Sequence, residues 1–374
     1  MAGIYLHIPF CKKACHYCDF HFSTTTDSFD EMVNAICREI KLRKTYLNSE
    51  IIETIYFGGG TPSLLNSSQL NRLLNVIKEE FEIAADAEIT LEANPDDLQK
   101  ETLQMLKEEG VNRLSIGIQS FREADLVLMN RAHNSKQAMQ SVKDAKDAGF
   151  TNITIDLIYG LPNLSTDDWK KNLEIAMNLN VDHLSCYSLT VEPKTALAKM
   201  ISQHKVSDID DAQSALHFEM LMNTAMENNY EHYEISNFAR NKNYSKHNTS
   251  YWQRKKYLGV GPSAHSFDGE SRQWNIYNNA VYIRSLAKDE IPFEREELSK
   301  RDKFNEYILT SLRTQWGINI ELIRSEFGEE VAEKLIVKLN EQLKEAMMTV
   351  ENKNYILTRK GKFFADKISL ALFE

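Results

Sequence analysis

The stretch IYLHIPFCKKACHYCDF, residues 4–20, decides the fold of this chain. A short apolar run at 4–8 is followed by three cysteines, Cys11, Cys15 and Cys18, at the spacing C-x3-C-x2-C. In a sheet of parallel strands, functional residues gather just beyond the carboxyl ends of the strands. The stretch therefore predicts the first strand of such a sheet, with a cysteine-rich loop at its functional end.

Three thiolates on one loop can ligate a single soft metal centre. A [4Fe–4S] cluster normally takes four protein ligands, so three cysteines would leave one iron open for a different ligand. Zinc held by the three thiolates and either His16 or His21 is an alternative, although the spacing does not resemble the usual zinc pairs. Three unligated thiols would leave reactive groups crowded together. We favour the open-iron cluster.

Composition limits the class of protein. Five cysteines, an odd and low number, argue against a disulfide framework, and we expect Cys37 and Cys186 to be buried core thiols. The 44 Lys and Arg against 54 Asp and Glu give a net charge of −10, which disfavours a nucleic-acid partner. No apolar run approaches the roughly 18 residues of a transmembrane segment. The N-terminus resembles a strand rather than a signal peptide, so we expect a cytoplasmic protein.

Strand-like and helix-like segments alternate through the first half of the chain. This order predicts an α/β fold, a partial (β/α)6 barrel of the TIM type, with parallel strands inside and helices outside. The predicted strands are 4–8, 54–58, 88–93, 113–119, 152–158 and 183–189. The predicted helices between them are 28–47, 67–80, 98–109, 135–148 and 166–179.

Three regions are expected along the chain. Residues 1–200 form the barrel, and residues 201–288, rich in aromatic, Asn and His residues, complete it. Residues 289–374 predict a smaller, mainly helical domain. Its order of three amphipathic helices, a short hairpin and a final helix is typical of a winged-helix fold.

Polar residues and glycines stand at the predicted strand ends. Glycines there expose backbone groups to a ligand, and Glu92 could accept hydrogen bonds from ribose hydroxyls. A structural role is also open, because Glu92 could simply pair with Arg113 or Arg131. Taken together with the cysteine loop, these residues indicate a nucleoside site. The set is Gly58, Gly59, Gly60, Thr61, Glu92, Gln119, Arg131 and Asp156.

These motifs resemble the radical S-adenosylmethionine (SAM) superfamily, and in particular its branch similar to the oxygen-independent coproporphyrinogen III oxidases. The resemblance covers nearly the whole chain. It is carried by residues 4–20 and by YFGGGTPSLL (56–65), LEANPDD (91–97), RLSIGIQSF (113–121), LMNRAHN (128–134) and IDLIYGLP (155–162).

The resemblance implies a cofactor site. In that family the three cysteines hold a [4Fe–4S] cluster, SAM chelates the open iron, and one electron from the cluster cleaves SAM to a 5′-deoxyadenosyl radical. It implies that Cys11, Cys15 and Cys18 ligate the cluster. The residues implied to contact SAM, or to hold those contacts, are Tyr5, Tyr17, Gly59, Gly60, Thr61, Glu92, Gln119, Arg131 and Asp156.

Two departures separate this chain from the oxidases of that branch. Those enzymes usually carry a further cysteine where Phe20 stands here, and they have an extension before the first strand. Both departures resemble the haem-chaperone group of the branch, the HemW-like proteins. That group also carries an HNxxYW motif, which is HNTSYW at 247–252 here.

The resemblance therefore implies a haem-binding chaperone that delivers haem, its cargo, to respiratory enzymes. His247 could ligate or orient haem iron, and Tyr251 and Trp252 could stack on the porphyrin. A partly buried aromatic corner is the structural alternative, and His265 in GVGPSAHSF (259–267) is a second candidate ligand. The alternative function is oxygen-independent coproporphyrinogen III oxidase, which converts two propionates to vinyls. The haem acceptor is not identified, and a homodimer remains open.

Overall fold

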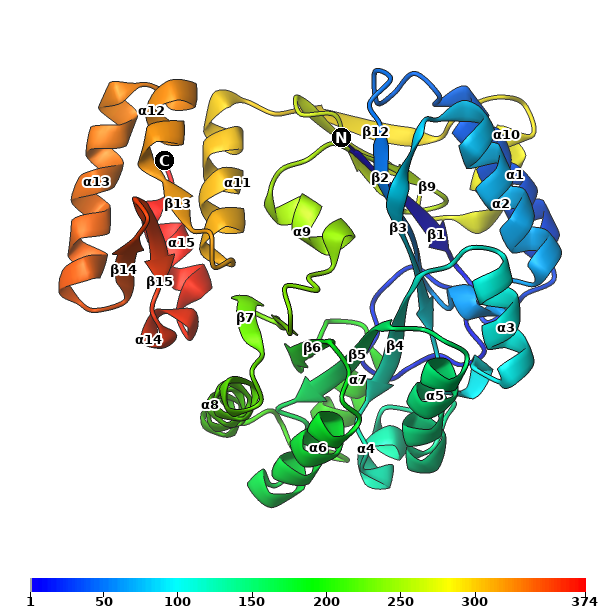
Figure 1. Ribbon diagram of the computed structural model, residues 1–374, viewed down its shortest axis with the longest axis horizontal. Coiled ribbons are helices and arrows are strands. Elements are labelled where there is room, and N and C mark those ends of the chain that lie inside the picture. The colour runs from blue at the N-terminus through cyan, green and yellow to red at the C-terminus, as the bar shows by residue number, and fades with distance from the viewer. Residues whose placement is uncertain (1) are drawn as a thin grey trace.

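A central sheet of twelve strands organises the computed structural model, which describes residues 2–374 (Figure 1). Its order is β12-β11-β10-β9-β1-β2-β3-β4-β5-β6-β8-β7. The six strands from β1 to β6 run parallel to one another, as predicted. They are β1 (Ala2–Ile8), β2 (Ile52–Gly59), β3 (Ile83–Ala93), β4 (Arg113–Gln119), β5 (Asn152–Tyr159) and β6 (His183–Ser188).

Helices follow the strands and cover the outer face of the sheet (Figure 1). Helices α2 and α5 both begin with a capping box. The N-cap side chains of Asn66 and Asn134 accept from the backbone N–H three residues later, and the glutamine at that position accepts from the N-cap backbone N–H. These local hydrogen bonds determine where both helices begin. The helices are α1 (Phe29–Leu42), α2 (Ser67–Glu80), α3 (Lys100–Glu108), α4 (Glu123–Leu128), α5 (Ser135–Asp147) and α6 (Thr166–Asn178). The five longer ones match the predicted helices.

The barrel is partial because β1 and β6 do not pair with each other. Strand β9 (Tyr257–Val260) lies parallel to β1 instead, and β8 (Asn237–Ala239) lies antiparallel to β6. The edges are completed by β10 (His265–Phe267), β11 (Ser271–Asn275) and β12 (Phe293–Glu297) on one side and β7 (Glu231–Glu234) on the other. The connecting helices are α7 (Ala196–Ser202), α8 (Asp211–Glu227), α9 (Lys246–Trp252) and α10 (Asn279–Leu286).

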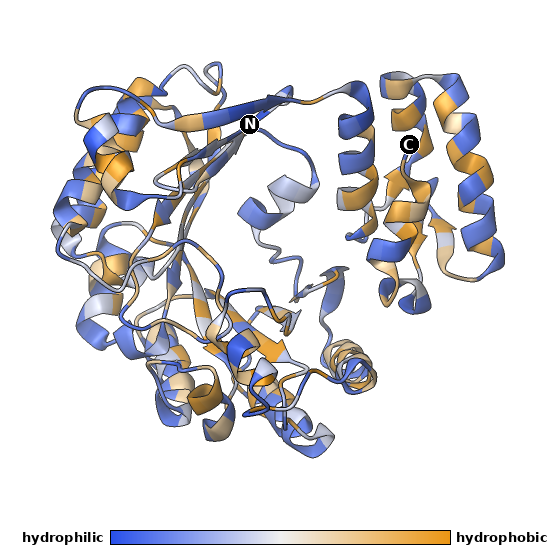
Figure 2. Ribbon diagram, turned by 180° about the vertical axis from the view of Figure 1, so that it is seen from behind, coloured by the Kyte–Doolittle hydropathy of each residue, from blue (hydrophilic) through white to orange (hydrophobic). Residues whose placement is uncertain are grey.

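Residues 300–372 pack around a hydrophobic core of their own, separate from that of the barrel. Figure 2 shows that hydrophobic residues recur along the helices and strands of this unit. Its helices are α11 (Lys300–Leu312), α12 (Ile320–Phe327), α13 (Glu329–Lys344), α14 (Arg359–Lys362) and α15 (Ala365–Leu372). A small antiparallel sheet of β13 (Ile318–Asn319), β14 (Met348–Glu351) and β15 (Asn354–Leu357) accompanies them.

The two cysteines outside the loop differ in burial. Cys186 on β6 is buried, as predicted. Cys37 is only half-buried, so the prediction that it is a buried core thiol was wrong. It lies at the edge of the buried face of α1, where its thiol is 4.0 Å from the carbonyl oxygen of Arg72.

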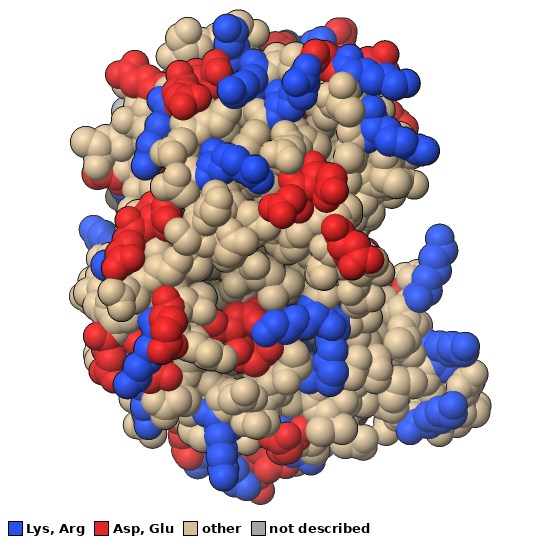
Figure 3. All heavy atoms as spheres, turned by 90° about the vertical axis from the view of Figure 1, so that its right-hand side faces the viewer, with Lys and Arg blue, Asp and Glu red and all other residues tan. Residues whose placement is uncertain are grey.

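The surface gives two further facts. Acidic and basic side chains are interspersed over most of the face shown in Figure 3. Within residues 2–374, no helix is both long enough and apolar enough to cross a membrane.

Candidate functional site

The cysteine loop leaves the carboxyl end of β1 and is closed at its base. Ser23 donates its backbone N–H to the carbonyl of Pro9, and Cys11 donates to the carbonyl of Ser23. The three cysteines on this loop are all half-buried and free of disulfides. Burial raises the pKa of the Cys11 thiol and raises that of Cys18 to about 11. Such thiols stay protonated until a cationic centre binds them, since metal coordination displaces the proton.

The geometry around the loop does not favour zinc. The His16 ring bonds through Nδ1 to the carbonyl of Leu128 at 2.8 Å, and the His21 ring bonds through Nε2 to the Asn279 side chain at 2.7 Å. Each ring keeps a second nitrogen, so what disfavours zinc is where the side chains lie relative to one another. Across the described part of the chain, no three His, Cys, Asp or Glu side chains are placed around one ion position. In an iron–sulfur cluster each thiolate binds a different iron, so separated sulfurs on one loop suit a cluster better than a single ion.

Arg131 ties the loop to the ends of the neighbouring strands. Its Nη1 donates to Cys15 Sγ at 3.2 Å and to the Tyr17 hydroxyl at 3.5 Å. Its Nη2 donates to Asn94 Oδ1 at 2.6 Å and to the carbonyl of Gly117 at 2.7 Å. Its Nε is buried and has no partner among the described residues. A guanidinium placed in this way leaves one donor free for an anionic ligand group.

Glu92 lies at the end of β3 and faces the same space. It accepts from the Tyr56 hydroxyl at 2.7 Å and from the backbone N–H of Gly59 at 3.3 Å. Burial, the largest cause, raises the pKa of its carboxyl to about 7. The structural alternative of a pair with Arg113 is not realised, because Arg113 lies 3.9 Å from Glu88 instead.

The glycine turn after β2 lies directly against the first strand. Gly59 has a φ of +108°, and a Cβ on Gly60 would come within 2.6 Å of the carbonyl oxygen of Phe10. Only glycine allows so close an approach of backbone to backbone. The next residue, Thr61, contacts the Asn94 side chain at 3.2 Å and hydrogen-bonds the Cys11 thiol.

Two further predicted residues complete the strand ends. Asp156 on β5 accepts from Ser115 at 3.4 Å, and burial raises its pKa to about 7. Gln119 adopts a φ of +67° where the pairing of β4 with β5 shifts register. A non-glycine residue in this region is strained, a condition that concentrates at ligand sites.

Sequence reasoning missed Tyr56 and Asn94, which hold Glu92 and Arg131 in place. Both stand inside motifs quoted above, YFGGGTPSLL and LEANPDD. Neither could be singled out, because their partners come from other strands.

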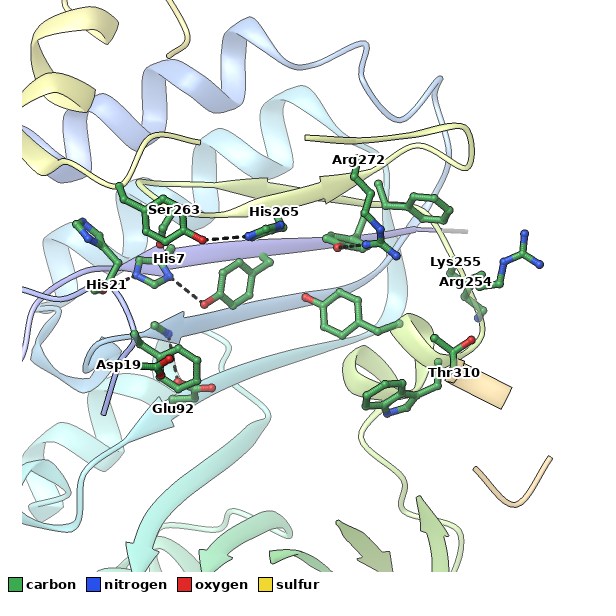
Figure 4. Close-up of a pocket in the computed structure, with 18 residues that line it drawn as sticks. His7, Asp19, His21, Glu92, Arg254, Lys255, Ser263, His265, Arg272 and Thr310 are labelled. Atoms are coloured by element: carbon green, nitrogen blue, oxygen red, sulfur yellow. Dashed lines mark hydrogen bonds between the residues drawn. The ribbon is translucent and has the colours of Figure 1, made fainter. Parts of the chain in front are cut away.

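A cavity of about 720 Å³ opens beside these residues and extends toward α11 (Figure 4). Its size falls in the range of sites for small molecules and cofactors. His7, Asp19, His21 and Glu92 lie toward one end in Figure 4, and Arg254, Lys255 and Thr310 toward the other. We call these the cofactor end and the far end. Other residues that line the cavity include Tyr5, Phe20, Gly59, Tyr251, Trp252, His265 and Arg272.

The HNTSYW motif forms α9, which packs between the first strands and α11 (Figure 1). Tyr251 and Trp252 line the cavity. Trp252 lies under the guanidinium of Arg313, 5.1 Å from its ring centre, and its indole N–H has no partner among the described residues.

His247 lies behind this wall and is completely buried. Its Nδ1 bonds to the Thr54 hydroxyl and its Nε2 to the Tyr251 hydroxyl, both at 2.7 Å. Its ring stacks on Tyr56 with centres 4.9 Å apart. Burial lowers its pKa to about 3, so it stays neutral. In this conformation neither ring nitrogen faces the cavity, and the motif histidine supports Tyr251.

Comparison with known proteins identifies the class. The radical SAM superfamily model matches residues 5–176, and the HemN C-terminal domain model matches residues 298–364. The solved structure of coproporphyrinogen III oxidase (HemN) from Escherichia coli, described as a radical SAM enzyme, superposes with a TM-score of 0.86 at 25% identity. The match covers 100% of this chain and 90% of that one. The fold and the cysteine loop thus define a radical SAM protein.

Relatives that are more than 30% identical to this chain show which family of radical SAM proteins it belongs to. The chain is 32% identical to heme chaperone HemW of Bacillus subtilis (strain 168), over 98% of both chains. It is 35% identical to heme chaperone HemW of Lactococcus lactis, over 90% of this chain and 89% of that one. The chain belongs to the HemW family. The resemblance inferred from the motifs is confirmed.

Proposed function

We propose that this protein is a haem-binding chaperone that holds haem in the cavity and delivers it to respiratory enzymes. The observation that carries the proposal is the cavity itself, whose far end has an aromatic wall, Tyr251 and Trp252, with Arg254 and Arg272 beside it. Flat aromatic rings suit a porphyrin face, and guanidinium groups suit its propionates. The similarity to the heme chaperones HemW of Bacillus subtilis and Lactococcus lactis supports the same proposal.

The cofactor end suits a radical SAM cofactor set. We propose that Cys11, Cys15 and Cys18 hold a [4Fe–4S] cluster, which when bound supplies an electron for cleavage of SAM. The unpaired Nε of Arg131 and the cavity-facing Glu92 carboxylate offer one donor and one acceptor to SAM. Tyr5, Tyr17, Gly59, Gly60, Thr61, Gln119 and Asp156 complete the proposed SAM site.

We further propose the three-region division at residues 200 and 288, and a cytoplasmic location. The separate core of residues 300–372 supports the second boundary. Under this division the far end of the cavity lies where the barrel meets the C-terminal domain, since Thr310 of α11 also lines it.

Porphyrinogen oxidation is the second candidate, favoured by the full-length match to HemN. Phe20 argues against it: it lines the cavity, is 70% exposed, and stands where those oxidases usually have a cysteine. The test is anaerobic incubation of cluster-loaded protein with SAM, a reductant and coproporphyrinogen III. We expect no protoporphyrinogen from a preparation that demonstrably cleaves SAM, and steady product formation would contradict the chaperone proposal.

Delivery itself is tested by transfer. Haem-loaded protein is mixed with membranes whose respiratory enzymes have been depleted of haem, and recovery of respiratory activity is followed. We expect faster recovery than with the same concentration of haem on serum albumin. Equal recovery from both donors would count against a chaperone.

A further inference from the structure

Three histidines line the cavity, and two of them are already engaged. His7 accepts from the Tyr5 hydroxyl at Nδ1, 3.1 Å away, and donates from Nε2 to the carbonyl of His21 at 2.9 Å. His21 bonds to the Asn279 side chain at 2.7 Å. Both nitrogens of His7 are bonded, so this ring cannot ligate a metal without losing a good hydrogen bond. The His21 ring has only Nδ1 left, and its bond to Asn279 fixes its orientation.

His265 differs from both. It is exposed and lines the cavity, and the one hydrogen bond of its ring within residues 2–374 is a long contact of 3.4 Å from Nε2 to the Tyr277 hydroxyl (Figure 4). Partial burial and the nearby charge of Arg272 lower its pKa, so it is neutral near pH 7. Neutral imidazole is the form that ligates metals.

The fold holds the backbone of His265 in a paired strand, and Nδ1 of its ring has no hydrogen-bond partner among the described residues. Residue 265 pairs with Trp274 across β10 and β11, and the two rings stack with centres 6.1 Å apart. On the other side the backbone of Gly259 in β9 packs directly against the backbone of His265. A Cβ on Gly259 would come within 2.0 Å of the His265 carbonyl oxygen. A side chain carried on a paired strand is held more precisely than one on a loop.

Arg272 lies on the same wall of the cavity (Figure 4). Its guanidinium makes a two-point contact with Glu306 of α11, with Nε–Oε1 at 2.6 Å and Nη2–Oε2 at 2.9 Å. The pair is partly exposed, with side-chain exposures of 31% and 23%. A ligand carboxylate can replace one protein carboxylate on such a fork without leaving the cation unpaired.

We propose that His265 is the axial ligand of the cargo iron and that Arg272 binds a propionate of the same porphyrin, taking it in exchange for Glu306. This assignment rests on the proposed haem-binding function and adds its ligand set. It differs from a site on His247, whose two ring nitrogens are both bonded away from the cavity.

The test is a haem titration followed by absorbance, on full-length, cluster-loaded protein. The variants are His265→Ala, His265→Met and Arg272→Gln, and the matched control is His204→Ala, an exposed histidine that does not line the cavity. We expect His265→Ala to shift the Soret band and weaken binding at least about tenfold, and free imidazole to restore both. We expect the spectrum of His265→Met to change to that of thioether ligation. Arg272→Gln should weaken binding without moving the band.

Two negative results are distinguishable. If wild-type protein binds saturably and His265→Ala has the same spectrum and affinity, the ligand assignment is overturned and the chaperone function stands. If wild-type protein shows no saturable binding, the proposed function fails and takes the ligand assignment with it. Far-UV circular dichroism and retained iron content show that a variant is folded, and imidazole rescue gives a result that misfolding cannot mimic.

Discussion

The two ends of the cavity are built on different principles. At the cofactor end, strand-end side chains bond to one another: Arg131 joins the cysteine loop to β3 and β4, and Glu92 is fixed by Tyr56 and the glycine turn. At the far end, Arg254 and Arg272 bond to Glu326 and Glu306 of the C-terminal unit. The first arrangement is preorganised within one domain. In the second arrangement a carboxylate of a bound molecule can replace the protein carboxylate on each arginine. Such exchange suits a molecule that must be both held and released.

The largest expected effect separates the two ends. Cys15→Ala removes one of the proposed cluster ligands, so we expect iron content and SAM binding to be nearly lost. Haem affinity, measured by titration of the same preparation, should change by less than about threefold, because the hydrogen bonds of the His265 and Arg272 side chains go to Tyr277 and to Glu306 and Tyr257, not to the cysteines of the loop.

Cys186→Ala is the matched control, since that thiol is buried far along the sheet in β6. It should retain iron. Parallel loss of haem binding and cluster in Cys15→Ala would show that the two ends form one site.

The second prediction concerns the buried motif histidine. His247→Ala removes a ring with two hydrogen bonds and a stacking partner, so we expect the free energy of unfolding to fall by about 2–4 kcal/mol. Thermal or urea unfolding measures this. The Soret position of any haem that still binds should be unchanged, whereas a band shift like that of His265→Ala would place His247 on the iron.

The third prediction uses the raised pKa of Glu92. The pKa of this carboxyl in the folded protein, about 7, lies above its ordinary value of 4.5. Below pH 4.5 the carboxyl is protonated and its contribution to the stability of the folded state is fully present. This contribution is lost as the pH rises through 7. We expect Glu92→Gln to raise the free energy of unfolding at pH 8 by about 1–3 kcal/mol, which a higher melting temperature would report. Near pH 4 the substitution should have little effect.

The same variant should weaken SAM binding about tenfold at pH 8, because the amide keeps only one acceptor oxygen for ribose hydroxyls and puts an NH2 donor in place of the other. Glu101→Gln, on the exposed face of α3, is the control. A variant that binds SAM normally while gaining stability would remove Glu92 from the cofactor site.

The smallest effect is expected at the exchangeable ion pair. Glu306→Gln leaves Arg272 free for a cargo carboxylate, so haem should bind about two- to threefold more tightly, within the small energies of partly exposed ion pairs. Haem dissociation rates would measure it. Weaker binding in Glu306→Gln would mean that Glu306 positions the arginine rather than competing for it.

The barrel and the cofactor end could be predicted from the sequence because they depend on local order. Each strand is followed by its helix, and parallel strand ends necessarily meet at one edge, which brings Cys15, Glu92 and Arg131 together from three separate motifs. Capping residues such as Asn66 and Asn134 fixed the helix starts to within a residue.

The far end could not be predicted in the same way. The burial of His247 depends on Thr54 and Tyr56, nearly two hundred residues earlier in the chain, and the Arg272–Glu306 pair depends on how α11 packs beside the barrel. An isolated HNxxYW motif does not say which of its side chains turns outward. Here Tyr251 and Trp252 face the cavity and the histidine does not.

The central claim is that the cavity binds haem as cargo at one site. A titration of anaerobically reconstituted, cluster-loaded protein with haem, followed at the Soret band, tests it most directly. We predict saturation near one equivalent per chain with micromolar or tighter affinity. Absorbance that rises without saturating, as for haem partitioning non-specifically, would contradict the account.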